Sequence, residues 1–356
     1  MKFIGHNVIA TDHSWKFDNR EGVITFEYGR ETTMDTKTDR LIRTLRLRHL
    51  ELLVVLSESA TMRGAATRLH LSQPAISKML GEIEDCFGAR MFDRSHQGIH
   101  ANMLGLSAAF RARGALHELA RATEDVDAMQ SGVTAVLRVG APSVTAAIPA
   151  AIARLRKRVP GAAVQLAEGR VHELIHRLLE GELDCVFGAI SPELIASDMI
   201  PLLEPVVLLK DELCVLTSTS NKSVLGRRLK WADLRADQWV LPPKETLVRQ
   251  AFITAFLNSG TTPPVPIIEA MSSVTIGALL RRDASLLCAV RLEHALDEVA
   301  RGDVQRLKVL PRIVLPSFGL FFRRDGLERP AILNEFAEAI RTVSANVASP
   351  RRPRRS

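Results

Sequence analysis

The sequence has 356 residues, of which 46% are hydrophobic and 24% charged, an ordinary globular composition with enough apolar material for several domains. This composition excludes a disordered or fibrous chain, and no apolar run approaches the ~18 residues that a membrane helix needs. The net charge of +7 is compatible with a polyanionic partner. Four scattered cysteines without a CxxC pair exclude a dense disulfide framework and a zinc ribbon. We expect a soluble, cytoplasmic protein without a secretory signal.

Both ends of the chain differ from the rest of it. Residues 1–43 show no sustained periodicity, so we predict a disordered or loosely attached extension. Met34 would be a sensible translation start, which leaves open whether this extension belongs to the native protein. Residues 341–356 finish in SPRRPRRS and are predicted to form a basic tail. Such a tail adds nonspecific DNA affinity or only solubility.

Helical periodicity begins at Leu45 and predicts three helices in a domain that we assign to residues 44–102. The first follows the broad apolar face of LRLRHLELLVVLSES. Thr61 is a suitable N-cap for the short helix MRGAATRLH, and Ser72 is one for the helix QPAISKMLGEIEDCF, which Gly88 should end. A helix, a short turn and a capped second helix form a helix-turn-helix.

The second of these capped helices has two distinct faces at 100° per residue. One is an apolar stripe that should belong to the core. The opposite face is small, hydrogen-bonding or basic and could enter a DNA major groove; it carries Pro74, Ser77, Lys78 and Gly81, with Gln73 at the N-terminal end. Periodicity alone leaves open an ordinary amphipathic helix with a solvated face.

The run AATRLHLSQPAISKMLGEIEDCFGARMFDR resembles the winged helix-turn-helix of LysR-type transcriptional regulators, whose pattern is AAxxLxxSQPAxSxxIxxLExxLGxxLFxR. The matching residues are Ala65, Ala66, Leu69, Ser72, Gln73, Pro74, Ala75, Ser77, Ile83, Glu84, Gly88, Phe92 and Arg94. The resemblance implies binding to double-stranded DNA at an interrupted palindrome with a T…A core. It also implies that the DNA-binding residues are Thr61, Ser72, Gln73, Pro74, Ala75, Ser77, Lys78 and Arg94.

A turn-rich stretch suited to a wing follows Arg94, and Asn102 is a good N-cap for a further helix. We assign residues 103–132 to this long linker helix, roughly 40 Å in length. Its heptad-like seam consists of Ala109, Ala112, Leu116, Leu119, Thr123 and Val126. The resemblance implies that this helix pairs two subunits of a homodimer or homotetramer. Packing of the helix on its own chain is the alternative.

From residue 133 onward, strands and helices alternate as βαβαβ, which predicts a parallel sheet with helices on both faces. A second set of strands and helices follows before the chain returns to a last helix. Two α/β lobes with two crossings resemble the effector domain of the same family, which is built like a type II periplasmic solute-binding protein. We assign residues 133–340 to it, with lobe I at 133–205 and 306–340 and lobe II at 206–305.

A ligand cleft is expected between these lobes, because ligands of open α/β sheets bind beyond the carboxyl ends of the strands. Free N–H groups at helix N-termini there favour a carboxylate or another anion. The resemblance places in this inducer cleft Ser143, Thr145, Gly169, Pro243, Thr246, Ser272 and Ser273. For each hydroxyl, N-capping without a ligand is the alternative. GAPSVTAAIPA is similar to a subgroup that senses sugars or aromatic acids, while Glu245 would disfavour strongly anionic compounds.

The segment HELIH fits the zincin signature HExxH, with His172 and His176 on one helix face and Glu173 beside them. No third ligand follows at a workable spacing, and the segment falls where the solute-binding lobe places its second helix. Nucleotide-binding and GxSxG motifs are absent from the sequence. We therefore predict no metal, no cofactor and no enzymatic activity, with a zinc-dependent hydrolase as the alternative.

Together these patterns predict a multidomain LysR-type regulator. An all-α winged helix-turn-helix and a long linker helix precede a two-lobed α/β effector domain. A small-molecule inducer in that domain switches operator binding or activation, and RNA polymerase is an expected partner. The sequence leaves the inducer and the sign of regulation open. A stand-alone solute receptor would leave the N-terminal helices without a task and would need export.

Overall fold

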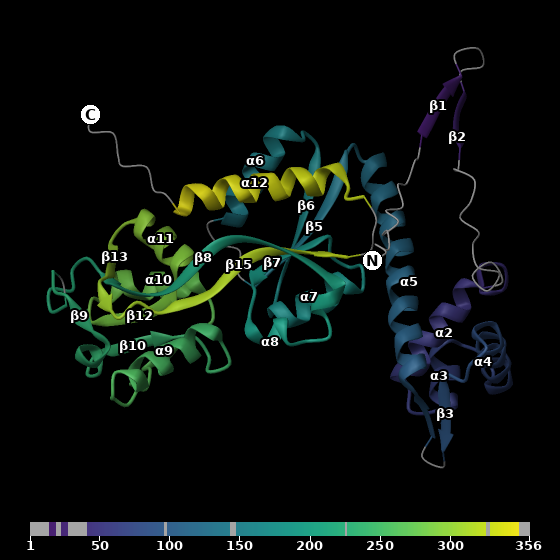
Figure 1. Cartoon of the computed structure of the whole chain (residues 1–356), viewed down its shortest axis with the longest axis horizontal. Helices are drawn as coiled ribbons and strands as arrows, with labels where there is room; N and C mark the ends of the chain where they lie inside the picture. Colours follow the sequence, from purple (N-terminus) through teal and green to yellow (C-terminus); the bar gives the residue numbers. More distant parts are fainter. Residues whose placement is uncertain are drawn as a thin grey trace, which may run out of the picture. The chain divides into compact units, whose positions relative to one another are not determined.

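The computed structural model describes residues 14–18, 23–27, 41–95, 98–142, 147–224, 226–324 and 328–348 (Figure 1). The chain divides into two compact units, Met1–Arg113 and Gly114–Ser356. The division falls within helix α5 (Met103–Gln130). The boundaries predicted from the sequence stay predictions. Among the described residues, no helix is both long and apolar enough to cross a membrane.

The first unit contains the predicted helix-turn-helix and its wing. Its helices are α2 (Leu47–Glu58), α3 (Met62–Arg68) and α4 (Gln73–Phe87), and the wing strands β3 (Phe92–Ser95) and β4 (Gly98–Ala101) pair antiparallel. The helices share one core, in which Leu52, Ile76 and Ile83 are fully buried. Burial of the apolar stripe of α4 leaves its opposite face outside this core, as the periodicity predicted.

The N-terminal extension, predicted to be disordered or loosely attached, contains a pair of strands that its sequence did not predict. Strands β1 (Ser14–Asp18) and β2 (Val23–Glu27) pair antiparallel within the segment expected to be disordered. In this register Trp15 lies opposite Phe26, and Phe17 lies opposite Ile24. The isolated aromatic residues thus follow a short two-residue alternation that is typical of strands.

The second unit is built on a nine-stranded sheet in the order β11, β10, β12, β8, β15, β7, β5, β6, with β13 paired to β8. The strands are β5 (Ala135–Ala141), β6 (Ala162–Glu168), β7 (Cys185–Ala189), β8 (Leu203–Ser218), β10 (Gln238–Leu241), β11 (Ile268–Glu269), β12 (Leu286–Arg291), β13 (Val304–Leu307) and β15 (Val314–Arg323). A separate ribbon joins β9 (Leu229–Lys230) to β14 (Val309–Leu310).

Two long antiparallel strands connect the halves of this sheet. One is β8 and the other is β15. The first half of β8 pairs with β15 in lobe I, and its second half pairs with β12 and β13 in lobe II. Strands β5, β6 and β7 are parallel to one another, as are β10, β11 and β12. The predicted two-lobed α/β fold with two crossings is confirmed.

Helices cover both faces of each half-sheet (Figure 1). In lobe I, α6 (Ala147–Arg158) and α12 (Ala331–Ala348) bury one face, and α7 (Val171–Leu179) buries the other with the short α8 (Pro192–Ile195). In lobe II, α9 (Leu247–Asn258) packs opposite α10 (Ser273–Arg282) and α11 (Leu292–Arg301). Sequence analysis did not anticipate α11, although its segment LEHALDEVAR carries Leu292, Ala295, Leu296 and Val299 at helical spacing.

Candidate DNA-binding and effector-binding sites

Helix α4 owes its position to local capping at both ends. The Ser72 hydroxyl accepts the N–H of Ala75 at 3.3 Å, and Pro74 lies in the first turn, where no intrahelical donor is needed. Gly88 ends the helix in the left-handed conformation at φ 67°, which a glycine adopts without steric cost. These signals act within a few residues of each other, so the sequence alone could predict them.

The outer face of α4 carries polar and basic groups. Gln73 and Pro74 are exposed at the N-terminal end. Lys78 is 80% exposed, and its Nζ lies 3.9 Å from Glu82 on the same helix. An exposed pair at this distance contributes little, so Lys78 remains able to reach a phosphate. This face can therefore offer both hydrogen bonds and positive charge to a duplex.

The other predicted DNA-binding residues lie on wing strand β3, at the start of α3 and on α4 itself. The Arg94 guanidinium, from wing strand β3, donates a hydrogen bond to the Ser77 hydroxyl at 3.3 Å. This bond fixes an exposed cation beside the helix, a link that sequence reasoning missed. Thr61 caps α3 by accepting the N–H of Gly64 at 3.0 Å, and Ala75 is half-buried. None of the predicted residues is fully buried, but their contact with DNA stays a prediction.

Helix α5 packs partly on its own chain, which corrects the predicted seam. Ala109 and Ala112 are only 2% and 3% exposed and belong to the core of the first unit. Small side chains let the helix approach that core closely, so these two positions do not pair subunits. Leu119 and Val126, further along the seam, are 47% and 53% exposed. Asn102 accepts the N–H groups of Leu104 and Gly105 at the start of the helix, as predicted.

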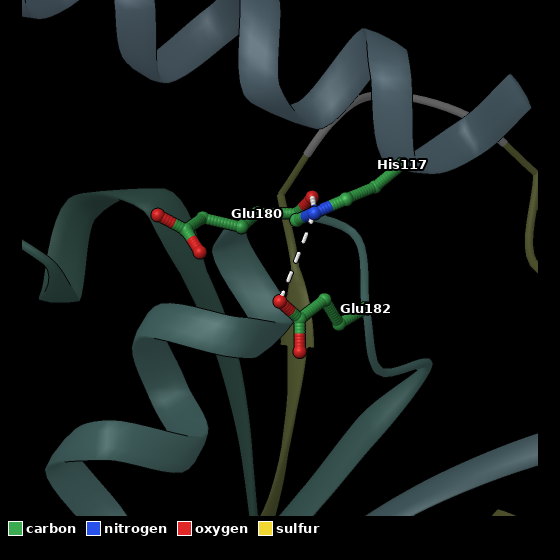
Figure 2. Close-up of side chains that lie close together, drawn as sticks. All are labelled: His117, Glu180 and Glu182. Carbon is green, nitrogen blue, oxygen red and sulfur yellow. Dashed lines mark hydrogen bonds and ion pairs between the residues drawn. The ribbon is translucent and has the colours of Figure 1, made fainter. Parts of the chain in front are cut away.

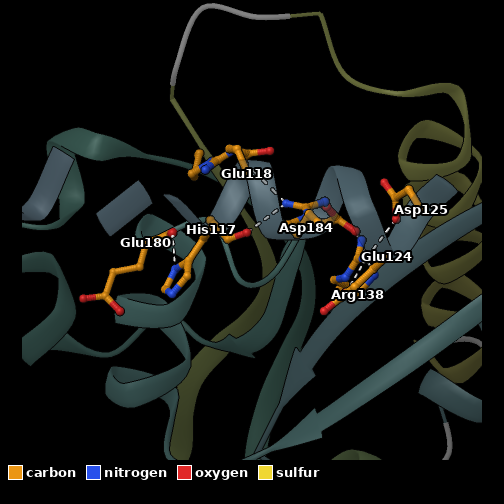
Figure 3. A network of polar contacts seen from close by, with 10 residues as sticks. His117, Glu118, Glu124, Asp125, Arg138, Glu180 and Asp184 are labelled. Atoms are coloured by element: carbon orange, nitrogen blue, oxygen red, sulfur yellow. Dashed lines mark hydrogen bonds and ion pairs between the residues drawn. The ribbon is translucent and has the colours of Figure 1, made fainter. Parts of the chain in front are cut away.

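A polar network joins the second half of α5 to lobe I (Figure 3). Arg138 of β5, which is 4% exposed, donates to Glu124 and Asp125 of α5 at 2.9 Å each. Arg121 of α5 pairs with Asp184, whose other oxygen accepts the Arg138 backbone N–H at 2.7 Å. The buried charges are therefore compensated, and they hold the helix to lobe I beside β5 and the start of β7.

A second part of this network surrounds His117 of α5 (Figure 2). Its Nδ1 lies 2.8 Å from the backbone oxygen of Glu180, and its Nε2 lies 3.8 Å from Glu182. Among the described residues, His117, Glu180 and Glu182 form a group with the donor types of a metal site. Arg177 also binds Glu182 at 2.7 Å, so a local ion-pair network explains the group without a metal.

The described cleft residues follow the carboxyl ends of parallel strands. Gly169 comes directly after β6, Pro243 and Thr246 come after β10, and Ser272 and Ser273 come after β11. Thr246 caps α9 by accepting the Arg249 N–H at 3.2 Å, and Ser272 caps α10 by accepting the Thr275 N–H at 3.4 Å. Both hydroxyls are thus engaged in capping, which is the alternative that the sequence left open.

Some of the predicted cleft residues are not brought together by any observed contact. Thr246 donates to the carbonyl oxygen of Pro243 at 2.8 Å, whereas Gly169 and Ser272 lie on separate elements of the two lobes. Ser143 and Thr145 lie outside the described residues. Arg249, which sequence reasoning missed, is 5% exposed and donates to the carbonyl oxygen of Pro242 at 3.0 Å. An arginine inside the apolar helix segment LVRQAFITAF was the signal that could have revealed it.

The two lobes contact each other through a group of buried charged residues that no sequence motif predicted. Glu293 at the start of α11 accepts the N–H of Ala147 at the start of α6, at 2.9 Å. Burial raises the pKa of Glu293 to about 7, although this N–H bond opposes the shift. Next to it, Arg291 forms an ion pair with Asp211 at 3.2 Å and lies over the ring of Phe318. The chain's own carboxylate thus occupies a helix N-terminus of the kind predicted to bind an anion.

Comparison with known proteins identifies both units. A family model described as "LysR substrate binding domain" matches residues 130–345, and one described as "Bacterial regulatory helix-turn-helix protein, lysR family" matches residues 47–106. The chain is 32% identical over 286 residues to the HTH-type transcriptional regulator GalR of Pseudomonas putida, covering 80% of this chain and 70% of the relative. The chain belongs to the LysR family.

Other relatives and solved structures agree with this assignment. The HTH-type transcriptional regulator GbpR of Azospirillum brasilense is 29% identical, over 84% of this chain and 87% of its own. Among solved structures, full-length OxyR from Pseudomonas aeruginosa matches with a TM-score of 0.54 at 21% identity, over 83% of this chain and 95% of its own. CbnR in complex with its target DNA matches with a TM-score of 0.51 at 23% identity, over 84% of this chain and 100% of its own. These structural matches support the fold.

As a LysR-type regulator, the protein combines a DNA-binding domain with a domain that binds a small-molecule effector. The relatives named above are transcriptional regulators rather than enzymes. In the HELIH segment, the Nε2 atoms of His172 and His176 lie 3.2 Å apart on the exposed face of α7. Among the described residues, no third ligand of suitable type joins this pair. The solvated-face interpretation of the motif agrees with this geometry.

The four cysteines are all buried free thiols. Burial raises the pKa of Cys214 to about 12 and also raises the pKa values of Cys185 and Cys288. Because the thiolate is the form that reacts with peroxide, these three groups are poorly suited to oxidation. These thiols therefore have the character of apolar core side chains.

Proposed function

We propose that this LysR-type regulator reads its operator through the outer face of α4. Gln73 contacts a base edge in the major groove, and Lys78 contacts a phosphate. The observation that supports this assignment is the separation of the helix into a fully buried stripe and an exposed face bearing these two side chains. The operator is an interrupted palindrome, because two copies of the unit present the helix in two half-sites, and the resemblance to the family implies its T…A core.

The effector of this regulator is a small molecule that binds between the lobes, beyond the carboxyl ends of the parallel strands. Among the described residues, we expect Thr246, Ser272 and Ser273 to contact the effector, because they follow strands β10 and β11. Ser143 and Thr145 remain predicted contacts. Effector binding changes DNA binding or activation only if the ligand favours one arrangement of the lobes over another. The group formed by Glu293, Arg291 and Asp211 connects the lobes, so it is one place where such a change would be felt.

The protein acts as a homodimer or homotetramer in the cytoplasm, where it meets the chromosome and RNA polymerase. The exposed apolar residues of α5, Leu119 and Val126, support pairing through the second half of that helix. We assign no enzymatic activity to the chain.

The assignment of α4 is tested by fluorescence anisotropy with the DNA upstream of the gene, compared with random-sequence DNA. The Gln73→Ala variant is expected to lose ~1–3 kcal/mol at the specific site and to bind random DNA as the wild type does. The Lys78→Ala variant is expected to bind both DNAs more weakly and to reduce the salt slope by about one. Lys157→Gln, which removes an exposed cation of α6, is the matched control. Unchanged affinity in both α4 variants would contradict the proposal.

A further inference from the structure

A cavity of about 410 Å³ opens in lobe II beside β8 and β13, and none of the predicted inducer residues lines it. Its floor is apolar and is formed by Leu213 and Val215 of β8 and Leu307 of β13. All three side chains are less than 8% exposed and belong to the core on the α9 side of the sheet. The floor is therefore a rigid surface that offers contact area to an apolar group.

Four cations surround this floor: Arg228, Arg306, Lys308 and Arg312. Glu212 binds Arg306 and neutralises much of its charge. Within the described part of the chain, Arg228, Lys308 and Arg312 make no ion pair with a carboxylate. Three exposed cations therefore converge on one cavity without a matching acid. The three like charges repel one another, and a bound anion relieves this repulsion because it is attracted by all three.

The size and lining of the cavity define a ligand class. Small-molecule sites are concave, mostly apolar and carry a few placed polar groups, within about 300–1,000 Å³. Inorganic phosphate would use the cations but leave the apolar floor uncovered. A neutral apolar molecule would cover the floor but leave the positive charge uncompensated. An organic anion with a flat apolar body and two negative groups satisfies both.

We propose that this cavity, lined by Leu213, Leu307, Lys308 and Arg312, is a second ligand site that binds an organic dianion with an apolar body. It shares no lining residue with the predicted inducer positions, so it goes beyond the function proposed above. The floor includes β8, which crosses between the lobes, and Arg312 lies two residues before the other crossing strand, β15, so an occupant contacts β8 and lies close to the start of β15. Occupancy can therefore bias the arrangement of the lobes if the ligand binds one arrangement better.

The probe for this site is naphthalene-2,6-dicarboxylate, titrated into the full-length protein by isothermal titration calorimetry. Naphthalene-2,6-dimethanol is its neutral isostere. The test variant is Lys308→Gln/Arg312→Gln, which changes two exposed side chains and should leave the fold intact. The control variant is Arg282→Gln, which removes an exposed cation from α10 on the opposite face of the sheet. Circular dichroism checks the fold of both variants.

We expect saturable binding of one dianion per chain, at least tenfold weaker binding of the neutral isostere, and at least tenfold weaker binding to the double variant. Arg282→Gln should bind the probe as the wild type does. Absence of saturable binding at millimolar concentration, or equal binding by the double variant, would overturn the proposal. So would a double variant that keeps its affinity for the dianion but loses affinity for DNA, because the cations would then serve the nucleic acid.

Discussion

Replacing Asp184 by asparagine should release the second half of α5 from lobe I. The Asp184 carboxylate is 12% exposed and accepts two hydrogen bonds, one from the Arg138 backbone N–H at 2.7 Å and one from the Arg121 guanidinium. An asparagine of the same shape has only one oxygen. Its amide N–H₂ group must therefore face one of the two donors.

The magnitude follows from what remains of the network. Arg121 is 17% exposed and keeps a hydrogen bond to the carbonyl oxygen of Gly181 at 2.9 Å and a longer ion pair with Glu118 at 3.7 Å, so its charge is only partly compensated after the change. A hydrogen bond to a charged group contributes about 1.5–3 kcal/mol, and a buried donor left without its partner adds to the loss. We expect the Asp184→Asn variant to unfold with a free energy about 2–4 kcal/mol below that of the wild type.

Differential scanning calorimetry measures this change. For a unit of this size, 1 kcal/mol corresponds to about 2–4 °C, so Tm should fall by roughly 5–10 °C. Glu118→Gln is the matched control, because Glu118 is 48% exposed and its pair with Arg323 lies at the surface of the same network. That control should cost less than about 1 kcal/mol. If Asp184→Asn is as stable as the control, the network does not hold α5.

Two further predictions concern assembly and pH. The Leu119→Glu variant places a charge on the exposed apolar part of α5, so its oligomer should dissociate in size-exclusion chromatography. The control variant Ala120→Glu should remain assembled. An intact Leu119→Glu oligomer would place the interface elsewhere. Burial raises the pKa of Glu293 from 4.5 to about 7, so the folded state binds its proton more tightly than the unfolded state and stability falls as pH rises between these values. In urea unfolding at pH 8, the Glu293→Gln variant should therefore be more stable than the wild type by up to about 3 kcal/mol, and this difference should vanish near pH 4.5. Equal stability of the two proteins at both pH values would refute the argument.

Local signals in the sequence determined much of the DNA-binding unit. The caps at Ser72, Thr61 and Asn102 bond to N–H groups two or three residues away, and the core stripe of α4 repeats with the helical period. Such contacts join neighbours along the chain, so residue types at fixed spacings are enough to predict them. The alternation of strands and helices likewise predicted the two-lobed sheet, because each element must bury its apolar face against the next layer.

Only the tertiary structure decided the contacts between distant parts of the chain. The seam of α5 could not show that Ala109 and Ala112 pack on their own unit, because small apolar residues suit either partner equally. The bond from Ala147 to Glu293 joins residues 146 positions apart, and the lobe II cavity brings Arg228 together with the cations of residues 306–312. Periodicity carries no information on such pairs, since the path of the folded backbone alone brings them together.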